Sequence, residues 1–143
     1  MSELPSTIKH FFPPATSVSG ISTVMSPQGG VRAIAQAVIQ CVGGLKVGAV
    51  GPGVVYATSD IEFHKALRLD REVVGRAWRR QLGELMSVGD AHHAHIMLFV
   101  DSNASFYAFT DPDGKLYSLG RFAQAMEALL LGLDYGMPLE ADG

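Results

Sequence analysis

Three histidines stand directly ahead of an apolar run in the segment GDAHHAHIMLFVD, residues 89–101. In an extended strand alternate side chains share a face, so His93 and His95 would point the same way, and imidazole is a common metal ligand. A catalytic zinc site needs a third protein ligand as well. The candidates for that ligand are His64, Asp90 and Asp101. The simpler interpretation is a polar loop leading into a strand, so we predict no metal, no cofactor and no catalytic residue.

Charged residues offer a second kind of chemistry, because they are unevenly spread. Residues 1–83 carry nine Lys and Arg against five Asp and Glu, whereas residues 84–143 carry two against nine. Asp101, Asp111 and Asp113 fall at strand ends and turns, where aspartate commonly bonds to the local backbone. Exposed together, they could also form an acidic rim that mimics phosphate toward a basic partner. The arginines around Trp78 are more simply a solvated helix face, and we predict no nucleic-acid binding.

Length and composition place these residues in one compact domain. The chain has 143 residues, of which 48% are hydrophobic and 17% charged, and its net charge is −3. We expect an irregular N-terminal arm over residues 1–28 and a single domain over residues 29–143. The one cysteine excludes an internal disulfide, and we found neither a signal peptide nor a long apolar stretch, so we expect a cytoplasmic protein without membrane contact.

Apolar spacing predicts the elements that would position the polar residues. It indicates a helix from Val31 to Val42 ended by two glycines, a second helix from Asp70 to Leu82, and a third over residues 121–132. Strands are predicted in LKVGAV and VVYATS, on either side of the turn at residues 51–53, with IEF as a short further strand. Three more follow in HIMLFVD, SFYAFT and KLYSL. The order predicts an α+β fold in which about three helices pack on an antiparallel sheet of about five to six strands.

The order of short motifs along the chain resembles the third branch of the SUKH superfamily of bacterial immunity proteins. These motifs are GGL at 43–45, GPG at 51–53, Phe63, the helix with Trp78, LGELMSVGD at 82–90, FVD at 99–101, FYAF at 106–109, DGKLYSLG at 113–120 and ALLLG at 128–132. They cover roughly residues 30–132. The resemblance implies a SUKH-like sheet wrapped by helices, and a protein that neutralises a cognate polymorphic toxin by binding it. Nucleases and nucleic-acid deaminases are typical toxins of this kind.

The sequence therefore predicts a non-catalytic immunity protein, either a monomer or a homodimer, and not an enzyme. Residues expected at the partner-binding surface, chosen for exposure and charge, are Asp90, His93, His95, Asp101, Asp111 and Asp113. One alternative keeps the fold but makes the chain a partner subunit that stabilises or regulates a deaminase-like or biosynthetic enzyme. Another is a small metal-dependent enzyme that uses His93 and His95.

Overall fold

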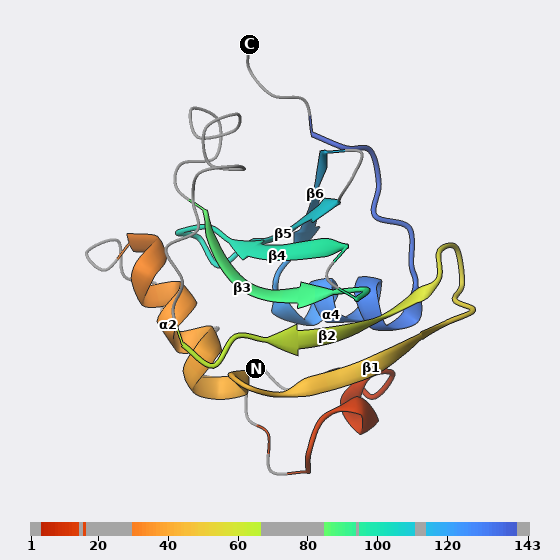
Figure 1. Cartoon of the computed structure of the whole chain (residues 1–143), viewed down its shortest axis with the longest axis horizontal. Helices are drawn as coiled ribbons and strands as arrows, with labels where there is room; N and C mark the ends of the chain where they lie inside the picture. The colour runs from red at the N-terminus through yellow and green to blue at the C-terminus, as the bar shows by residue number, and fades with distance from the viewer. Residues whose placement is uncertain are drawn as a thin grey trace.

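The computed structural model describes residues 4–14, 16, 30–66, 85–93, 95–110 and 114–139, and it confirms the predicted α+β class (Figure 1). Six strands form one antiparallel sheet in which each strand pairs with the next along the chain. The strands are β1 (Lys46–Gly51), β2 (Thr58–Phe63), β3 (Met86–Ala91), β4 (Ile96–Val100), β5 (Phe106–Thr110) and β6 (Lys115–Gly120). The helices within the described residues are the 3-10 helix η1 (Lys9–Phe11) and the α-helices α2 (Gly30–Val42) and α4 (Phe122–Leu131).

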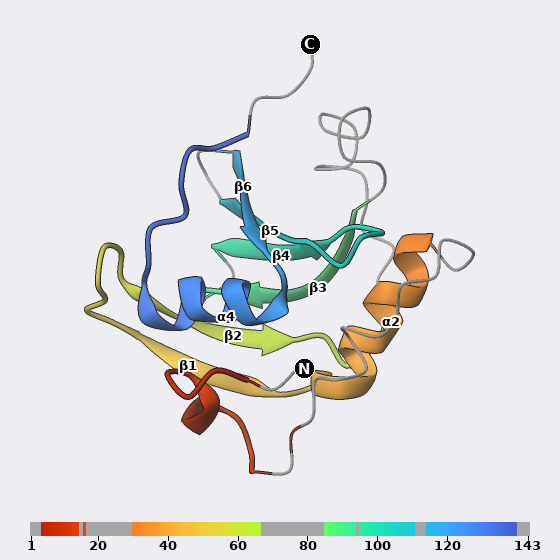
Figure 2. The ribbon, with the colours of Figure 1, turned by 180° about the vertical axis from the view of Figure 1, so that it is seen from behind.

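Both α-helices pack against the same face of the sheet, where they form the main core (Figure 2). The predicted apolar face of α2 is confirmed, since Ile34 and Val38 are fully buried, and the helix ends at Val42 before the two glycines. The predicted apolar face of α4 is confirmed as well. Two α-helices are described instead of three, because the helix predicted from Asp70 to Leu82, with Trp78, lies outside the described residues.

The strands β4, β5 and β6 confirm the predicted three-stranded meander, but the first half of the sheet differs from the prediction. The second strand does not begin right after residues 51–53: β2 starts at Thr58 and contains the IEF segment that was predicted as a separate strand. Residues 52–57 form an exposed loop instead. The central strand β3 was not predicted, because its sequence MSVGDA has glycine and aspartate and no regular alternation of apolar residues.

The described part of the N-terminal arm contributes to the core. Ile8 and Phe12 flank η1 and are 0% and 5% exposed, and the ring of Phe12 lies 6.4 Å from that of Phe122 in α4. At the other end of the sheet, the amide of Leu139 donates to the carbonyl of Leu116 in β6. The described segments on either side of the domain are thus fastened to it by core packing and by backbone pairing.

The face of the sheet opposite the two α-helices is divided in two. Over β4 to β6 it is apolar, with a second buried cluster formed by Leu85, Phe99, Tyr107 and Leu116. Over β1 to β3 it is polar and partly exposed. No helix within the described residues is long and apolar enough to cross a membrane.

Candidate partner-binding site

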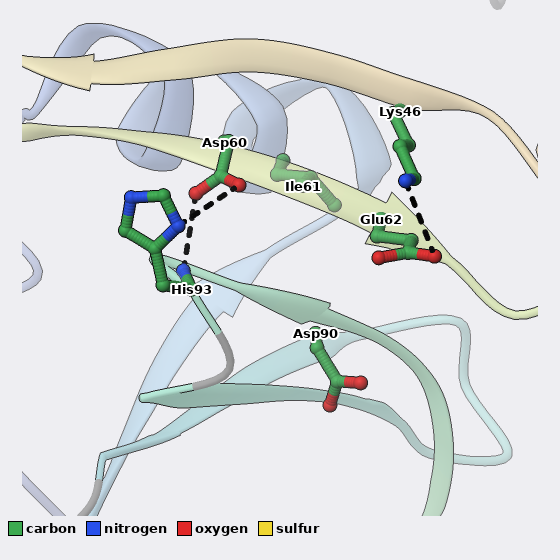
Figure 3. A pocket seen from close by; sticks show the side chains of 6 residues that line it. All are labelled: Lys46, Asp60, Ile61, Glu62, Asp90 and His93. Atoms are coloured by element: carbon green, nitrogen blue, oxygen red, sulfur yellow. Dashed lines mark hydrogen bonds and ion pairs between the residues drawn. The ribbon is translucent and has the colours of Figure 1, made fainter.

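The polar half of this face is built by the register of β2 with its two neighbours. Asp60 and Glu62 alternate along β2 and therefore point to the same side of the sheet. Glu62 lies opposite Lys46 of β1 and opposite Asp90 of β3. Together with Ile61 and His93, these side chains line an open depression of about 300 Å³ (Figure 3). We call the surface formed by Lys46, Asp60, Glu62, Asp90 and His93 the acidic face.

Carboxylates outnumber basic groups on the acidic face. The only ammonium group among its residues, Lys46 Nζ, lies 4.0 Å from Glu62 Oε2, and the two side chains are 75% and 61% exposed. An ion pair this long and this exposed adds little stability. Figure 3 shows no hydrogen bond or ion pair between the carboxylate of Asp90 and the other side chains drawn there. Three carboxylates against one ammonium group leave two negative charges when His93 is neutral.

His93 is held over the depression by an unusual turn between β3 and β4. His92 and His93 both have positive φ angles, 53° and 55°, which cost about 1 kcal/mol or more each in residues other than glycine. Asp60 compensates: its backbone carbonyl accepts from the His92 amide at 2.9 Å, and its Oδ1 accepts from the His93 amide at 3.1 Å. Its Oδ2 also lies 3.8 Å from His93 Nδ1. Asp60 thus fixes the turn as well as carrying charge.

The same turn is tied to the core by His92. Its Nδ1 lies 3.3 Å from the hydroxyl of Ser59, a residue that is 0% exposed. The Ser59 side chain also lies close to Tyr135, which follows α4, and burial raises the pKa of that tyrosine. This small network links β2, the β3–β4 turn and the segment after α4, so the rim of the acidic face is firmly attached to the domain.

The structure brings together two of the residues that the sequence singled out, Asp90 and His93. His95 is exposed, and its amide donates to the carbonyl of His92 at 3.1 Å as the turn closes. His92 and His93 lie in a left-handed turn and not in an extended strand, so the strand alternation on which the shared face of His93 and His95 was predicted does not apply here. Asp111 and Asp113 lie outside the described residues.

Asp101 does not have the exposure expected of a surface residue: it is only 4% exposed. One of its oxygens accepts from the amides of Asn103 at 2.8 Å and Ser105 at 3.0 Å, and the other accepts from the Tyr107 hydroxyl at 2.7 Å. Burial, together with this hydrogen bond, raises the pKa of Tyr107. The short side chain therefore closes the β4–β5 turn, a role that the turn sequence itself also allowed.

The candidate metal ligands are not assembled in the part of the chain that the structure describes. No group of three or more His, Cys, Asp or Glu side chains there is close enough to hold a metal ion. His64 is buried, and its Nε2 lies 2.8 Å from the hydroxyl of Ser87 on the neighbouring strand.

Sequence reasoning missed Asp60, Glu62 and Lys46. The signal was present in the segment SDIEF, where acidic and apolar residues alternate as they do in a strand with one polar face. It was obscured by the apolar residues just before it, which suggested that the strand began earlier. Comparisons with models of protein families, with curated proteins and with solved structures found no match to this chain.

Proposed function

We propose that this chain is a non-catalytic immunity protein that binds and neutralises a cognate polymorphic toxin of the nuclease or nucleic-acid deaminase type. The observation that carries the proposal is the acidic face, with Asp60, Glu62 and Asp90 arranged on two neighbouring strands. The ordered motifs between residues 30 and 132, which resemble the SUKH superfamily, support the same function. An antiparallel sheet packed by helices is compatible with the SUKH-like fold that the resemblance implies.

The charge of the acidic face suits a partner that binds nucleic acid. Such proteins gain affinity by placing Lys and Arg against phosphates, so the surface around their active sites is basic. Carboxylates presented on strands β2 and β3 would take the place of those phosphates. Complementary charge of this kind speeds association and selects the partner.

The rigidity of the site favours binding further. Asp60 and Glu62 stand on a strand paired on both sides, and Asp60 is additionally engaged by the backbone of the β3–β4 turn. The side chain of Asp60, already ordered in this way, loses less conformational entropy when a partner binds. Neutralisation then needs no chemical step, because the bound immunity protein lies across the path of the toxin's substrate.

Inhibition of the toxin encoded beside the gene tests the proposal. The purified chain is titrated into the purified toxin domain while nuclease or deaminase activity is followed. We expect activity to fall in proportion to the added chain and to vanish near equimolar amounts. Undiminished toxin activity in the presence of excess folded chain would refute the proposal. If the chain instead binds and stabilises a metabolic enzyme, the alternative of a regulatory subunit would replace it.

A further inference from the structure

Most of the exposed large hydrophobic side chains of the described residues lie at the end of β1 and in the loop that follows it. They are Val50 in β1, which is 41% exposed, and Val54, Val55 and Tyr56 in the loop, which are 74%, 58% and 42% exposed. The other, Met137, is 85% exposed and lies two residues after Tyr135, whose ring is tilted against that of Tyr56 with the ring centres 4.7 Å apart. We call residues 50–56 the hairpin tip. Exposed apolar side chains that are neighbours along one loop, unlike singly scattered ones, point to an interaction site.

The hairpin tip is held firmly although its side chains face outward. The amide of Val54 donates to the carbonyl of Leu131 at 3.1 Å, and the amides of Val55 and Tyr56 both donate to the carbonyl of Gly132 at 2.8 Å. Figures 1 and 2 show the end of this hairpin beside the segment that follows α4. The backbone of the tip thus satisfies the carbonyls at the end of α4, and its valines point away on a fixed frame.

The charged residues next to the hairpin tip indicate which class of molecule binds it. Asp60 lies two residues along β2 from Thr58, which pairs with Gly51 at the base of the tip, and is therefore about 7 Å further along the strand. The exposed Asp134 precedes Tyr135. Lys46, the basic residue of β1, lies at the far end of that strand and contacts Glu62. Acidic flanks repel the same acidic tip of a second copy, nucleic acid and an anionic membrane, and attract a basic protein.

We infer that the hairpin tip is the apolar anchor by which this chain docks a basic protein partner, with Val54 and Val55 entering a pocket on that partner. Residues that dominate binding energy fill well-packed pockets from which water is excluded, and a tip that is already ordered loses less conformational freedom on binding. Naming the toxin as this partner rests on the proposed function. The anchor itself rests on the exposure, the backbone contacts and the flanking charges of the tip.

Site-specific photocrosslinking in the native host tests the docking role of the hairpin tip separately from the identity of the partner. A photoreactive amino acid replaces Val54 in the full chain, and the control carries it at Gln36, an exposed position on α2. We expect position 54 to crosslink to one basic protein that position 36 does not reach. Crosslinks only to a second copy, to lipid or to nucleic acid, or none at all, would overturn the inference.

Affinity measurements with the purified partner that the crosslinking identifies complete the test. In V54S/V55S the exposed apolar groups are lost while the three backbone hydrogen bonds can persist. We expect binding to weaken at least about tenfold, whereas the matched pair Q36S/Q40S changes it by less than about twofold. Equal affinities for the two variants would overturn the inference even if the partner is the toxin. If the partner is another basic protein and V54S/V55S weakens its binding, the inference holds and the proposed function fails.

Discussion

Gly132 and Gly114 provide a matched pair of substitutions that measures how tightly the hairpin tip is joined to α4. Both glycines have a φ angle of 68°, in the left-handed region, so alanine costs about 1 kcal/mol at either position from the backbone alone. A Cβ at Gly114 would meet nothing within 4 Å. A Cβ at Gly132 would collide with the carbonyl of Tyr56 and come within 3.0 Å of that of Ala57.

The collision sets the expected difference. To relieve it, the hairpin must move off the end of α4, which breaks the two hydrogen bonds that the Gly132 carbonyl accepts from Val55 and Tyr56. At about 1 kcal/mol net for each bond, Gly132→Ala should lower the free energy of unfolding by about 3 kcal/mol in all, and Gly114→Ala by about 1 kcal/mol.

Urea denaturation of the wild-type chain and the two variants provides the measurement, with the free energy of unfolding extrapolated to water. We expect the two variants to differ by about 2 kcal/mol, with Gly132→Ala the less stable. Equal losses would refute the view that the tip is rigidly fastened, because the two positions share the same backbone penalty.

Three further substitutions test the rest of the structure. Asp101 accepts three hydrogen bonds, and Tyr107 donates one of them. In urea denaturation, Asp101→Ala should therefore lower the free energy of unfolding by about 3 kcal/mol, and Tyr107→Phe by about 1 kcal/mol. Equal losses in the two variants would contradict this expectation. Since burial raises the pKa of Tyr107, its phenol stays protonated in the folded state while the unfolded chain ionises, so stability should fall as the pH rises above 10.0, and less so in Tyr107→Phe. His93→Gly should raise the free energy of unfolding by about 1 kcal/mol, because glycine adopts the positive φ without strain, yet it should weaken partner binding. An unchanged free energy of unfolding would show that the turn is not strained.

The elements that the sequence predicted correctly are those whose pattern is complete within one segment. The helix α4 has its apolar face, its capping Gln124 and its terminal Gly132 all within residues 121–132. Strands β4 to β6 alternate with clear turn residues. In these segments local preference and burial agree, so the pattern alone is sufficient.

The elements that were mispredicted depend on distant parts of the chain. The apolar residues Val54 and Val55 look like a strand, but the end of α4 binds their amides and holds them outside the sheet. Strand β3 is weak by composition and is kept in place by β2 and β4 on either side.

The candidate site shows the same dependence on distant contacts. Asp90 and His93 were recognised by residue type, whereas Asp60 joins them only through pairing between β2 and β3. The left-handed φ of His93 is likewise unpredictable from its neighbours in sequence, because the hydrogen bond that stabilises it comes from another strand. The burial of Asp101 follows from Tyr107, six residues further along the chain, which donates to it.

The most direct test of the central claim measures how the acidic face contributes to binding an inactivated domain of the cognate toxin that we propose as the partner. Isothermal titration calorimetry would compare the wild-type chain with D60N/E62Q/D90N, in which each side chain keeps its shape and loses its charge. The control is E127Q, a similar change on α4, which packs against the opposite face of the sheet. We predict that the triple variant binds at least about a hundredfold more weakly, with a smaller dependence on salt, and that E127Q changes affinity by less than about twofold. Binding of the triple variant as tight as that of the wild-type chain would contradict the account.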